Sequence, residues 1–489
     1  MSDASEISSI HRAVAATGEE NAERDAARLK ACVDVFRANE TRNDELYEIY
    51  EGTVPLHKVP TVVPERYKSL RVGCPWPEIA VQSVVERSRL EGLVFPEDSD
   101  EVDAAQALAE RCGLAAGYQT GLTDSLIAGV AFAVVARDDR GACLRWHTAQ
   151  SAAGTWDYAN DRLECGFAIV DRVRKRSATS GIEHWDTVPS KVDFYVSGGC
   201  WEITRAGTTT EWTAEWHPDP QPEPRMVALV FRPDGRHPLG RSRFTVPMRG
   251  IVQEYMANAL NLHVASEFTA VGQKWATGLT DAQLETFASN KWAASADTVV
   301  LATDNPSSGS NPQFGNFTQQ SMEPVLSVKR SLATDFAAAA SIPVAELLTQ
   351  DSNPTSAEAL TAMQNKLISL VESVNARNVR TLKKLALLLM AVEADTDVDG
   401  LSDTQRSVMV HMKSPATVSM AGQSDAMLKR IQALPFLAES DVAIEELGFT
   451  DDQQVRLKGD RDRYAAKQAV AAVAQQAGLD LSGSAEGTA

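Results

Sequence analysis

The stretch that decides the fold reads Gln350-Asp351-Ser352-Asn353-Pro354-Thr355-Ser356-Ala357-Glu358-Ala359-Leu360. Neither proline nor glycine follows until beyond Ala394, so we expect one uninterrupted helix from about Ser356. Its apolar residues recur every three or four positions, with one gap near Asn378, which is the period of one buried helix face. At 1.5 Å per residue the helix would be about 58 Å long. Thr355 and Glu358 have the spacing of a capping box, which would fix where the helix begins.

The segments before this helix predict a helix, a small excursion and a second helix. We expect the two helices at about Pro247–Gly272 and Met322–Ala340. Between them, Thr280 would cap a short helix, and Thr298–Ala302 and Phe314–Phe317 would be short strands. Periodicity alone favours an ordinary helical bundle, but these flanking segments argue for a more specific architecture.

Residues about 19–235 predict an α+β region in which helices precede an antiparallel meander. We expect helices at 19–39 and 42–51, the second stopping at Gly52. Alternating patterns then predict strands at 129–137, 142–148, 164–173, 191–196, 201–205, 209–216 and 226–231. Residues 1–18 look disordered. After the long helix we expect an acidic linker, a strand at 407–412, helices over 424–464 and a small, polar, disordered end.

The composition is that of a folded protein of several domains without a strongly basic surface. The 489 residues exceed the roughly 250–300 over which one core keeps growing. A net charge of −19 argues against tight wrapping around nucleic acid. We see no signal peptide and no apolar run near the ~20 residues of a membrane helix. The cysteines form no CxxC pair and fit reduced, mostly buried thiols in a cytosolic setting: Cys32, Cys74, Cys112, Cys143, Cys165 and Cys200.

No motif of a catalytic or metal site is present. The sequence has no GxxxxGK[ST] or GxGxxG phosphate loop, and the stretch 240–244 lacks the second glycine of a nucleophile elbow. The eight histidines are scattered. His263 and Glu267 could share a helix face, although a structural pair is favoured. The tryptophans of the β region could form a sugar platform, although sheet core is favoured. We therefore expect no enzyme activity, no cofactor and no metal.

This order of elements, with its local residues, resembles the portal proteins of tailed bacteriophages, in particular those of long-tailed phages of Gram-positive hosts. The resemblance covers about residues 40–460. It is carried by Tyr47–Gly52, Pro75–Phe95, Asp124–Val135, Gly240-Arg241-Ser242, Ile342-Pro343 with Asn353–Leu360, Ser424–Lys429 and Glu445–Phe449.

The resemblance implies an α+β portal fold with a wing, a helical stem, a small α/β clip, a long spine helix and a helical crown. The implied parts are a disordered N-terminus (1–18), the wing (19–239), the first stem helix (240–272), the clip (273–318), the second stem helix (319–345), the tunnel loop (346–356), the spine helix (357–394), a return strand and linker (395–414), the crown (415–470) and a flexible tail (471–489).

The resemblance also implies a dodecameric ring at one capsid vertex of the virion, assembled in the host cytoplasm and without a membrane partner. Double-stranded DNA would pass through the ring during packaging and ejection. The implied partners are the terminase large subunit, then the head–tail adaptor, and the major capsid and scaffolding proteins. The implied clip residues that bind terminase and adaptor are Thr298, Val299, Val300, Leu301, Phe314 and Phe317.

The implied tunnel loop that faces DNA comprises Gln350, Asp351, Ser352, Asn353, Pro354 and Thr355. The loop contains no basic residue, which argues against a direct grip on phosphate. We expect a steric valve instead, in a bore that binds DNA weakly because the ring is negatively charged.

Two other classes of function stay open at this stage. One is a structural head, tail or baseplate component without a DNA channel. The other is an enzyme, perhaps a hydrolase, in the α+β region. The sequence also leaves open whether the protein belongs to a virion, a prophage remnant or a gene-transfer particle.

Overall fold

The computed structural model describes residues 3–58, 63, 67, 69–96, 100–179, 182–209, 211–270, 274–277, 313–316, 321–348, 357–416, 420–447, 449 and 451–476. Helices and antiparallel sheets occur together, which confirms the predicted α+β class. The chain divides into two compact units, Met1–Pro415 and Ala416–Ala489. Among the helices in the described ranges, none combines the length and apolar character needed to cross a bilayer.

The first residues are helical and packed, which corrects the expectation of disorder over residues 1–18. The structure has α1 (Asp3–Glu6) and α2 (Ile10–Ala15) there. Their apolar side chains are buried in one cluster with α3 (Ala22–Glu51) and the five-stranded sheet; these are Ala4, Ile7, Ile10 and Val14. The prediction was wrong because the segment is polar on average. Its few apolar side chains find cover only on a folded sheet far along the chain.

The helix α3 is continuous over 30 residues, where two helices were predicted. No glycine or proline lies between Asn39 and Arg42 to break it, and Asn39 Nδ2 donates to the Val35 carbonyl within the helix. The predicted stop is confirmed, because Gly52 adopts the left-handed conformation (φ 69°) that glycine tolerates best.

The β region is an antiparallel meander, as predicted, but its division into two sheets and the strand at Ala152–Asp157 were not predicted. One sheet has the order β4-β5-β6-β7-β8 and the other β3-β2-β9. The strands are β2 (Val130–Asp138), β3 (Gly141–Thr148), β4 (Ala152–Asp157), β5 (Arg162–Thr179), β6 (Ile182–Val196), β7 (Gly199–Thr204), β8 (Thr213–Pro218) and β9 (Met226–Val230).

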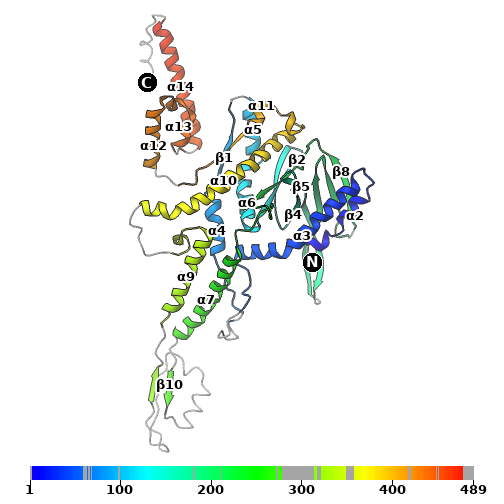
Figure 1. Ribbon diagram of the computed structural model, residues 1–489, viewed down its shortest axis with the longest axis vertical. Helices are drawn as coiled ribbons and strands as arrows, with labels where there is room; N and C mark the ends of the chain where they lie inside the picture. The colour runs from blue at the N-terminus through cyan, green and yellow to red at the C-terminus, as the bar shows by residue number, and fades with distance from the viewer. Residues whose placement is uncertain are drawn as a thin grey trace, which may run out of the picture. The chain divides into compact units, whose positions relative to one another are not determined.

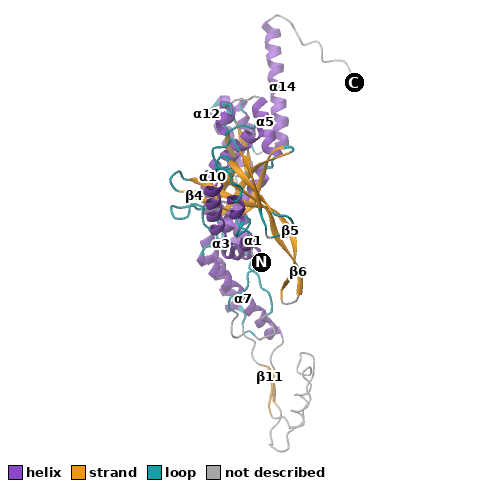
Figure 2. Cartoon of the chain, turned by 90° about the vertical axis from the view of Figure 1, so that its right-hand side faces the viewer, coloured by secondary structure: helices purple, strands orange, loops and turns teal. Residues whose placement is uncertain are grey.

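The strands β5 and β6 are much longer than the predicted 164–173 and 191–196. They pair as far as Thr179 and Ile182, whereas β4 reaches only Ala168 on β5 and β7 only Lys191 on β6. The remaining hairpin therefore projects from the sheet (Figure 2). Its sequence is basic and polar without apolar alternation, so the sequence pattern gave no strand signal there.

The core lies on both faces of the three-stranded sheet. Along β2, Phe132 and Val134 face the five-stranded sheet, while Ala133 and Val135 join the large helical cluster. That cluster includes α4 (Trp76–Val85), α5 (Asp100–Arg111) and α6 (Leu114–Ala128). A small sheet of β1 (Leu90–Val94) with β12 (Met409–Met412) joins segments more than 300 positions apart in sequence, which confirms the strand predicted at 407–412.

The remaining elements of the first unit lie between β9 and β12 in sequence. They are α7 (Val246–Ala270), β10 (Lys274–Thr277), β11 (Gln313–Asn316), α9 (Glu323–Ala340), the 3-10 turn η2 (Val344–Glu346), α10 (Ala357–Glu393), η3 (Val398–Gly400) and α11 (Asp403–Arg406). The predicted pair of helices and the long helix that follows them are confirmed.

The second unit is helical, as predicted for residues 424–464. It contains α12 (Met420–Ala433), η4 (Pro435–Glu439), α13 (Asp441–Glu446) and α14 (Asp451–Gln476). The flexible tail expected from residue 471 is corrected in part, because α14 continues through the alanine-rich stretch to Gln476.

Candidate functional site

Two antiparallel helices, α7 and α9, form a hairpin that carries a small β ribbon at its tip (Figure 1). Asn258 on α7 donates to the Val325 carbonyl on α9 over 3.2 Å. Beyond the helix ends, β10 pairs antiparallel with β11, from Lys274 opposite Asn316 to Thr277 opposite Gln313. The hairpin and its ribbon are therefore antiparallel pairs that follow one another along the chain.

The root of this hairpin is fixed by Arg243, which is 2% exposed. Its Nη2 donates to the Ala340 carbonyl at the end of α9 over 2.7 Å, and its backbone N–H donates to the Leu126 carbonyl over 2.8 Å. A cation at a helix C-terminus is favourable, but burial lowers the pKa of Arg243 to about 9. One side chain therefore ties the start of α7 to the end of α9.

Glycines at 129 and 240 allow the close approach of the chain segments around this root. A Cβ on Gly240 would lie 2.3 Å from the Gly129 carbonyl oxygen, and a Cβ on Gly129 would lie 2.9 Å from the carbonyl carbon of Arg241. Both glycines have positive φ. Within Gly240-Arg241-Ser242, glycine is therefore needed at position 240 for close backbone contact.

Aromatic rings fill the space between the hairpin and α4. Trp76 lies 4.3 Å from the Tyr255 ring on α7 and 5.6 Å from the Phe336 ring on α9, measured between centroids. Lys329 Nζ lies 5.7 Å from the centroid of the Tyr255 ring, within reach of a cation–π contact. The hairpin is therefore rooted in the core of the first unit.

The chain before the predicted loop is also anchored. Glu346 in η2 accepts a 2.5 Å hydrogen bond from Ser83 Oγ, and its other oxygen lies 3.6 Å from Arg87 Nη2. Both partners belong to α4 or follow it directly. Residues 349–356 separate this anchored turn from the start of α10.

A buried polar network holds the middle of α10. Asn378 Nδ2 donates to the Tyr118 hydroxyl over 3.0 Å, and Ser88 Oγ donates to Asn375 Oδ1 over 2.6 Å. The Ser88 and Tyr118 hydroxyls lie 2.8 Å apart. The apolar stripe is interrupted at Asn378 because this side chain hydrogen-bonds to the buried Tyr118 hydroxyl. Sequence reasoning missed this network, although the gap in the stripe was its signal.

The end of α10 is pinned by Glu393. Its Oε2 accepts from the Ala142 backbone N–H over 2.7 Å and lies 2.8 Å from Arg111 Nη2. The backbone hydrogen bond from Ala142 lowers the pKa of Glu393, with Arg111 adding to the effect. The helix is thus held at its last residue, Glu393, and at Asn378 about four turns before it.

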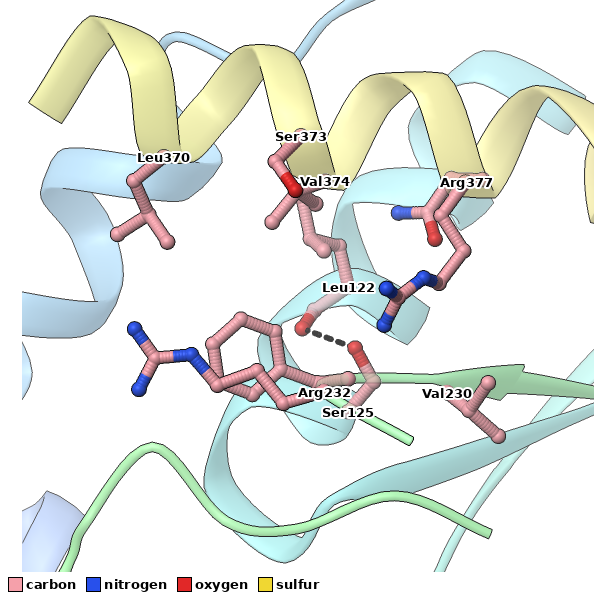
Figure 3. Close-up of a pocket in the computed structure, with 10 residues that line it drawn as sticks. Leu122, Ser125, Val230, Arg232, Leu370, Ser373, Val374 and Arg377 are labelled. Atoms are coloured by element: carbon pink, nitrogen blue, oxygen red, sulfur yellow. Dashed lines mark hydrogen bonds between the residues drawn. The ribbon is translucent and has the colours of Figure 1, made fainter. Parts of the chain in front are cut away.

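Two hollows lie near these elements. One is a cavity of about 60 Å³ beside α10. In Figure 3, Arg377 reaches from α10 toward it, and on its α6 side Ser125 Oγ donates to the Leu122 carbonyl of the same helix. A water occupies about 30 Å³ in the liquid, so this cavity is too small for a substrate.

The other hollow is a groove of about 440 Å³ between α3, β4 and residues 237–240. Its size would suit a ligand, and two of its polar side chains hold neighbouring segments of the fold. Arg42 donates to the Ala128 carbonyl and Asn43 to the Ala149 carbonyl.

Within the described ranges, no group of three His, Cys, Asp or Glu side chains could hold a metal ion. All six cysteines are free, and Cys32, Cys74 and Cys165 are buried.

Most predicted site residues lie outside the described residues. This holds for the loop residues Gln350, Asp351, Ser352, Asn353, Pro354 and Thr355, and for the clip residues Thr298, Val299, Val300, Leu301 and Phe317. Glu358 lies in the first turn of α10 and Phe314 lies in β11 opposite Ala276, but their side chains are not described. The capping box of Thr355 and Glu358 therefore stays a prediction, as do the roles of the loop and the clip.

Comparison with known proteins gives structural likenesses only. No protein-family model matches the chain, and no curated protein matches it. A chain of the structure described as "Virion of native gene transfer agent (GTA) particle" is similar at 14% identity, with a TM-score of 0.44 over 83% of this chain and 93% of that one. A chain of "Neck of empty GTA particle computed with C6 symmetry" is similar at 15% identity, with a TM-score of 0.44 over 79% and 94%. A chain of "Neck of native GTA particle computed with C12 symmetry" is similar at 14% identity, with a TM-score of 0.41 over 80% and 95%.

Proposed function

We propose that this chain is a structural component of a phage-like particle and, more specifically, its portal protein. In this proposal, copies of the chain form a ring at one capsid vertex, and double-stranded DNA passes through the ring during packaging and ejection. The particular relation to phages of Gram-positive hosts stays a prediction.

The observation that carries the proposal is the arrangement of α7, α9 and α10. A ribbon-tipped helical hairpin is rooted in the core by Arg243 and Trp76. The next segment is anchored at Glu346, and residues 349–356 then lead into a helix of 37 residues that is pinned at Asn378 and Glu393. In this proposal, residues 349–356 act between two anchored elements and would keep their position against a moving polymer.

The negative net charge of the chain is more typical of a channel through which DNA slides than of a protein that binds DNA tightly. A net charge of −19 per copy, multiplied around a ring, gives a repulsive or nearly neutral bore. Screening over about 8 Å at physiological salt limits this effect to groups close to the DNA. The small polar side chains of residues 350–356 would act as a steric valve.

The surrounding assembly follows from the same proposal. Residues 273–318 would bind first the terminase large subunit and then the head–tail adaptor, and the ring would also contact the major capsid and scaffolding proteins. The chain would sit in the virion after assembly in the host cytoplasm. We further propose that the chain hydrolyses no ATP itself, so that packaging energy comes from the partner motor; an ATPase assay on the purified protein tests this.

The decisive experiment compares the intact chain with a variant that lacks Ser352–Thr355. Negative-stain images and native mass measurements should show rings with an open channel for both proteins. In a packaging assay, the deletion should impair DNA packaging or retention. A compact monomer as the working form would overturn the portal proposal, whereas normal packaging by the deleted ring would overturn only the valve. A solid ring would favour the second candidate, a connector or baseplate protein without a channel.

A further inference from the structure

A groove runs along the free edge of the five-stranded sheet. The strand β4 lies at the end of the strand order β4-β5-β6-β7-β8. The groove of about 440 Å³ beside α3 is lined by five consecutive residues of this strand, from Ala152 to Trp156. Successive side chains of a strand point to opposite faces of the sheet. A hollow that touches every residue in a row therefore lies beside the strand rather than over one of its faces.

The pairing of β4 with β5 determines which backbone groups of β4 point toward this free edge. The Ile169 N–H donates to the Ser151 carbonyl over 2.8 Å, so the odd-numbered residues up to Thr155 are the ones that bond to β5. The N–H and C=O groups of Ala152 and Gly154 therefore point away from β5. Among the described residues, no backbone group of another segment forms a hydrogen bond with them.

These backbone groups lie on buried residues. Ala152 is 1% exposed, and Gly154 is buried as well. The nearby side-chain amides of Asn39 and Asn43 donate to backbone carbonyls outside β4. Buried backbone N–H and C=O groups of folded proteins are nearly always paired. An extended polypeptide is the partner that supplies such groups at the matching spacing of about 3.4 Å per residue.

The groove has apolar walls on both sides of the β4 edge. Phe36 belongs to the cluster that α3 forms with the five-stranded sheet, and Phe132 belongs to the cluster between the two sheets. Both rings line the groove, together with Val35 and Val130. A strand added to β4 would place its alternate side chains against these two walls. Strands that are covered on both faces have apolar residues at successive positions, so the occupant is expected to have them too.

One cation lines the groove without an acidic partner. Arg42 donates from Nη2 to the Ala128 carbonyl over 3.0 Å. Burial and the neighbouring Arg249 lower the pKa of Arg42, and none of the described carboxylates forms an ion pair with it. A guanidinium has five N–H donors in a fork that matches a carboxylate. The donors that Arg42 has left therefore favour an occupant with an acidic side chain.

We propose that this groove binds an extended segment of another protein, which adds as a strand to the free edge of β4. The backbone of the segment would pair with Ala152 and Gly154. Its apolar side chains would lie against Phe36 and Phe132, and one carboxylate would bind Arg42. In such complexes the backbone bonds give affinity and the side-chain contacts give specificity. This binding site needs only the fold of the first unit, so it is independent of the portal role.

The test uses the full chain and a small set of blocked, fluorescent seven-residue peptides. Each peptide has one central glutamate between pairs of valine, leucine or phenylalanine residues, and fluorescence anisotropy measures binding. We expect saturable binding by one or more peptides, weakened about tenfold or more when glutamine replaces the glutamate. Methylation of the peptide nitrogens should abolish binding, because it removes the N–H donors that pair with a strand. Absence of saturable binding by every peptide up to about 1 mM would overturn the inference.

Two further measurements locate the binding site on the protein. Binding should slow amide hydrogen exchange at Ala152 and Gly154, whereas Ala153, which already pairs with β5, should change little. Asn39→Trp should block the groove from the α3 side. Ala38→Trp is the matched control, because this exposed position on the same helix does not line the groove. Equal binding by the two variants, or protection elsewhere than in β4, would overturn the inference.

Other occupants and the portal proposal give distinguishable results. Laurate is an apolar carboxylate without a backbone that could pair with β4. If laurate competes as strongly as the best peptide, or if the methylated peptide keeps its affinity, the groove is a site for apolar acids and strand addition is wrong. Failure of the peptides with rings of the protein still seen by imaging would leave the portal proposal standing. Peptide binding by a protein that forms no ring would defeat the portal proposal and leave the binding site standing.

Discussion

Asn378 Nδ2 donates a hydrogen bond of 3.0 Å to the hydroxyl of Tyr118, so the middle of α10 is tied to α6 inside the core. Asn378 is 2% exposed and Tyr118 is 0% exposed. A helix with only apolar contacts could slide or rotate against its neighbours at small cost. Two buried asparagines with specific partners favour one register, because every other register leaves polar groups unpaired.

We expect Tyr118→Phe to lower the free energy of unfolding by about 1–3 kcal/mol. The change keeps the ring but removes the oxygen that Asn378 and Ser88 contact, and it leaves the buried Asn378 amide unpaired. Urea unfolding measures the effect. Glu372→Ala is the control on the exposed side of the same helix and should change stability by no more than about 0.5 kcal/mol. A double-mutant cycle with Asn378→Ala that gives simple additivity would show that the two residues do not act together.

We expect Arg243→Met to affect the stability of the whole fold and the local order at the hairpin root in different ways. Burial lowers the pKa of Arg243 to about 9, which means that the buried cation is costly, while its bond to Ala340 closes the hairpin root. Replacing a buried charge by an apolar side chain often stabilises by about 1–4 kcal/mol. We therefore expect an equal or higher free energy of unfolding together with faster amide hydrogen exchange at residues 341–348. A marked loss of stability would show that the hydrogen bond outweighs the cost of burying the charge.

Asp124 should make stability depend on pH. Burial raises its pKa from 3.8 to about 6, while the Tyr47 hydroxyl donates to its Oδ1 over 3.0 Å. The folded state thus binds the proton of the Asp124 carboxyl group more tightly than the unfolded state does. The contribution of Asp124 to stability is fully present below pH 4 and is lost as pH rises through about 6. A shift of this size corresponds to about 3 kcal/mol.

The matched variant for this effect is Asp124→Asn, whose amide oxygen can still accept from Tyr47. Unfolding free energies at pH 5 and pH 7.5 are compared in both proteins. The variant should gain stability relative to the natural chain as pH rises. A difference between the two proteins that stays constant with pH would contradict the raised pKa.

The thiols of Cys32 and Cys165 should react very slowly with alkylating reagents in the folded protein. Their sulfur atoms lie 3.6 Å apart, both residues are buried, and the hydrogen bond with Cys165 together with burial raises the pKa of Cys32. Alkylation followed by peptide mass analysis should label them on the order of 1,000-fold more slowly than in the unfolded chain. The partly exposed Cys143 is the internal control and should react sooner. Equal rates at Cys32 and Cys143 would show that α3 does not stay packed on the sheet.

The sequence determined the elements whose signals are local. The long helix α10, the helices α7 and α9, the stop at Gly52 and the order of the meander follow from apolar periods, glycine and proline positions and alternation. These features report the backbone that each segment prefers, and they need no knowledge of what the segment touches.

Only the tertiary structure decided the features that depend on distant partners. The helices at residues 3–15 form because the sheet covers Ile7 and Ile10, and the polar arm of β5 and β6 exists because its two strands pair with each other. Arg243 reaches Ala340 across 97 positions and Asn378 reaches Tyr118 across 260. A local pattern cannot foresee such pairs, because the free energy that fixes them comes from desolvation and hydrogen bonding between segments brought together only on folding.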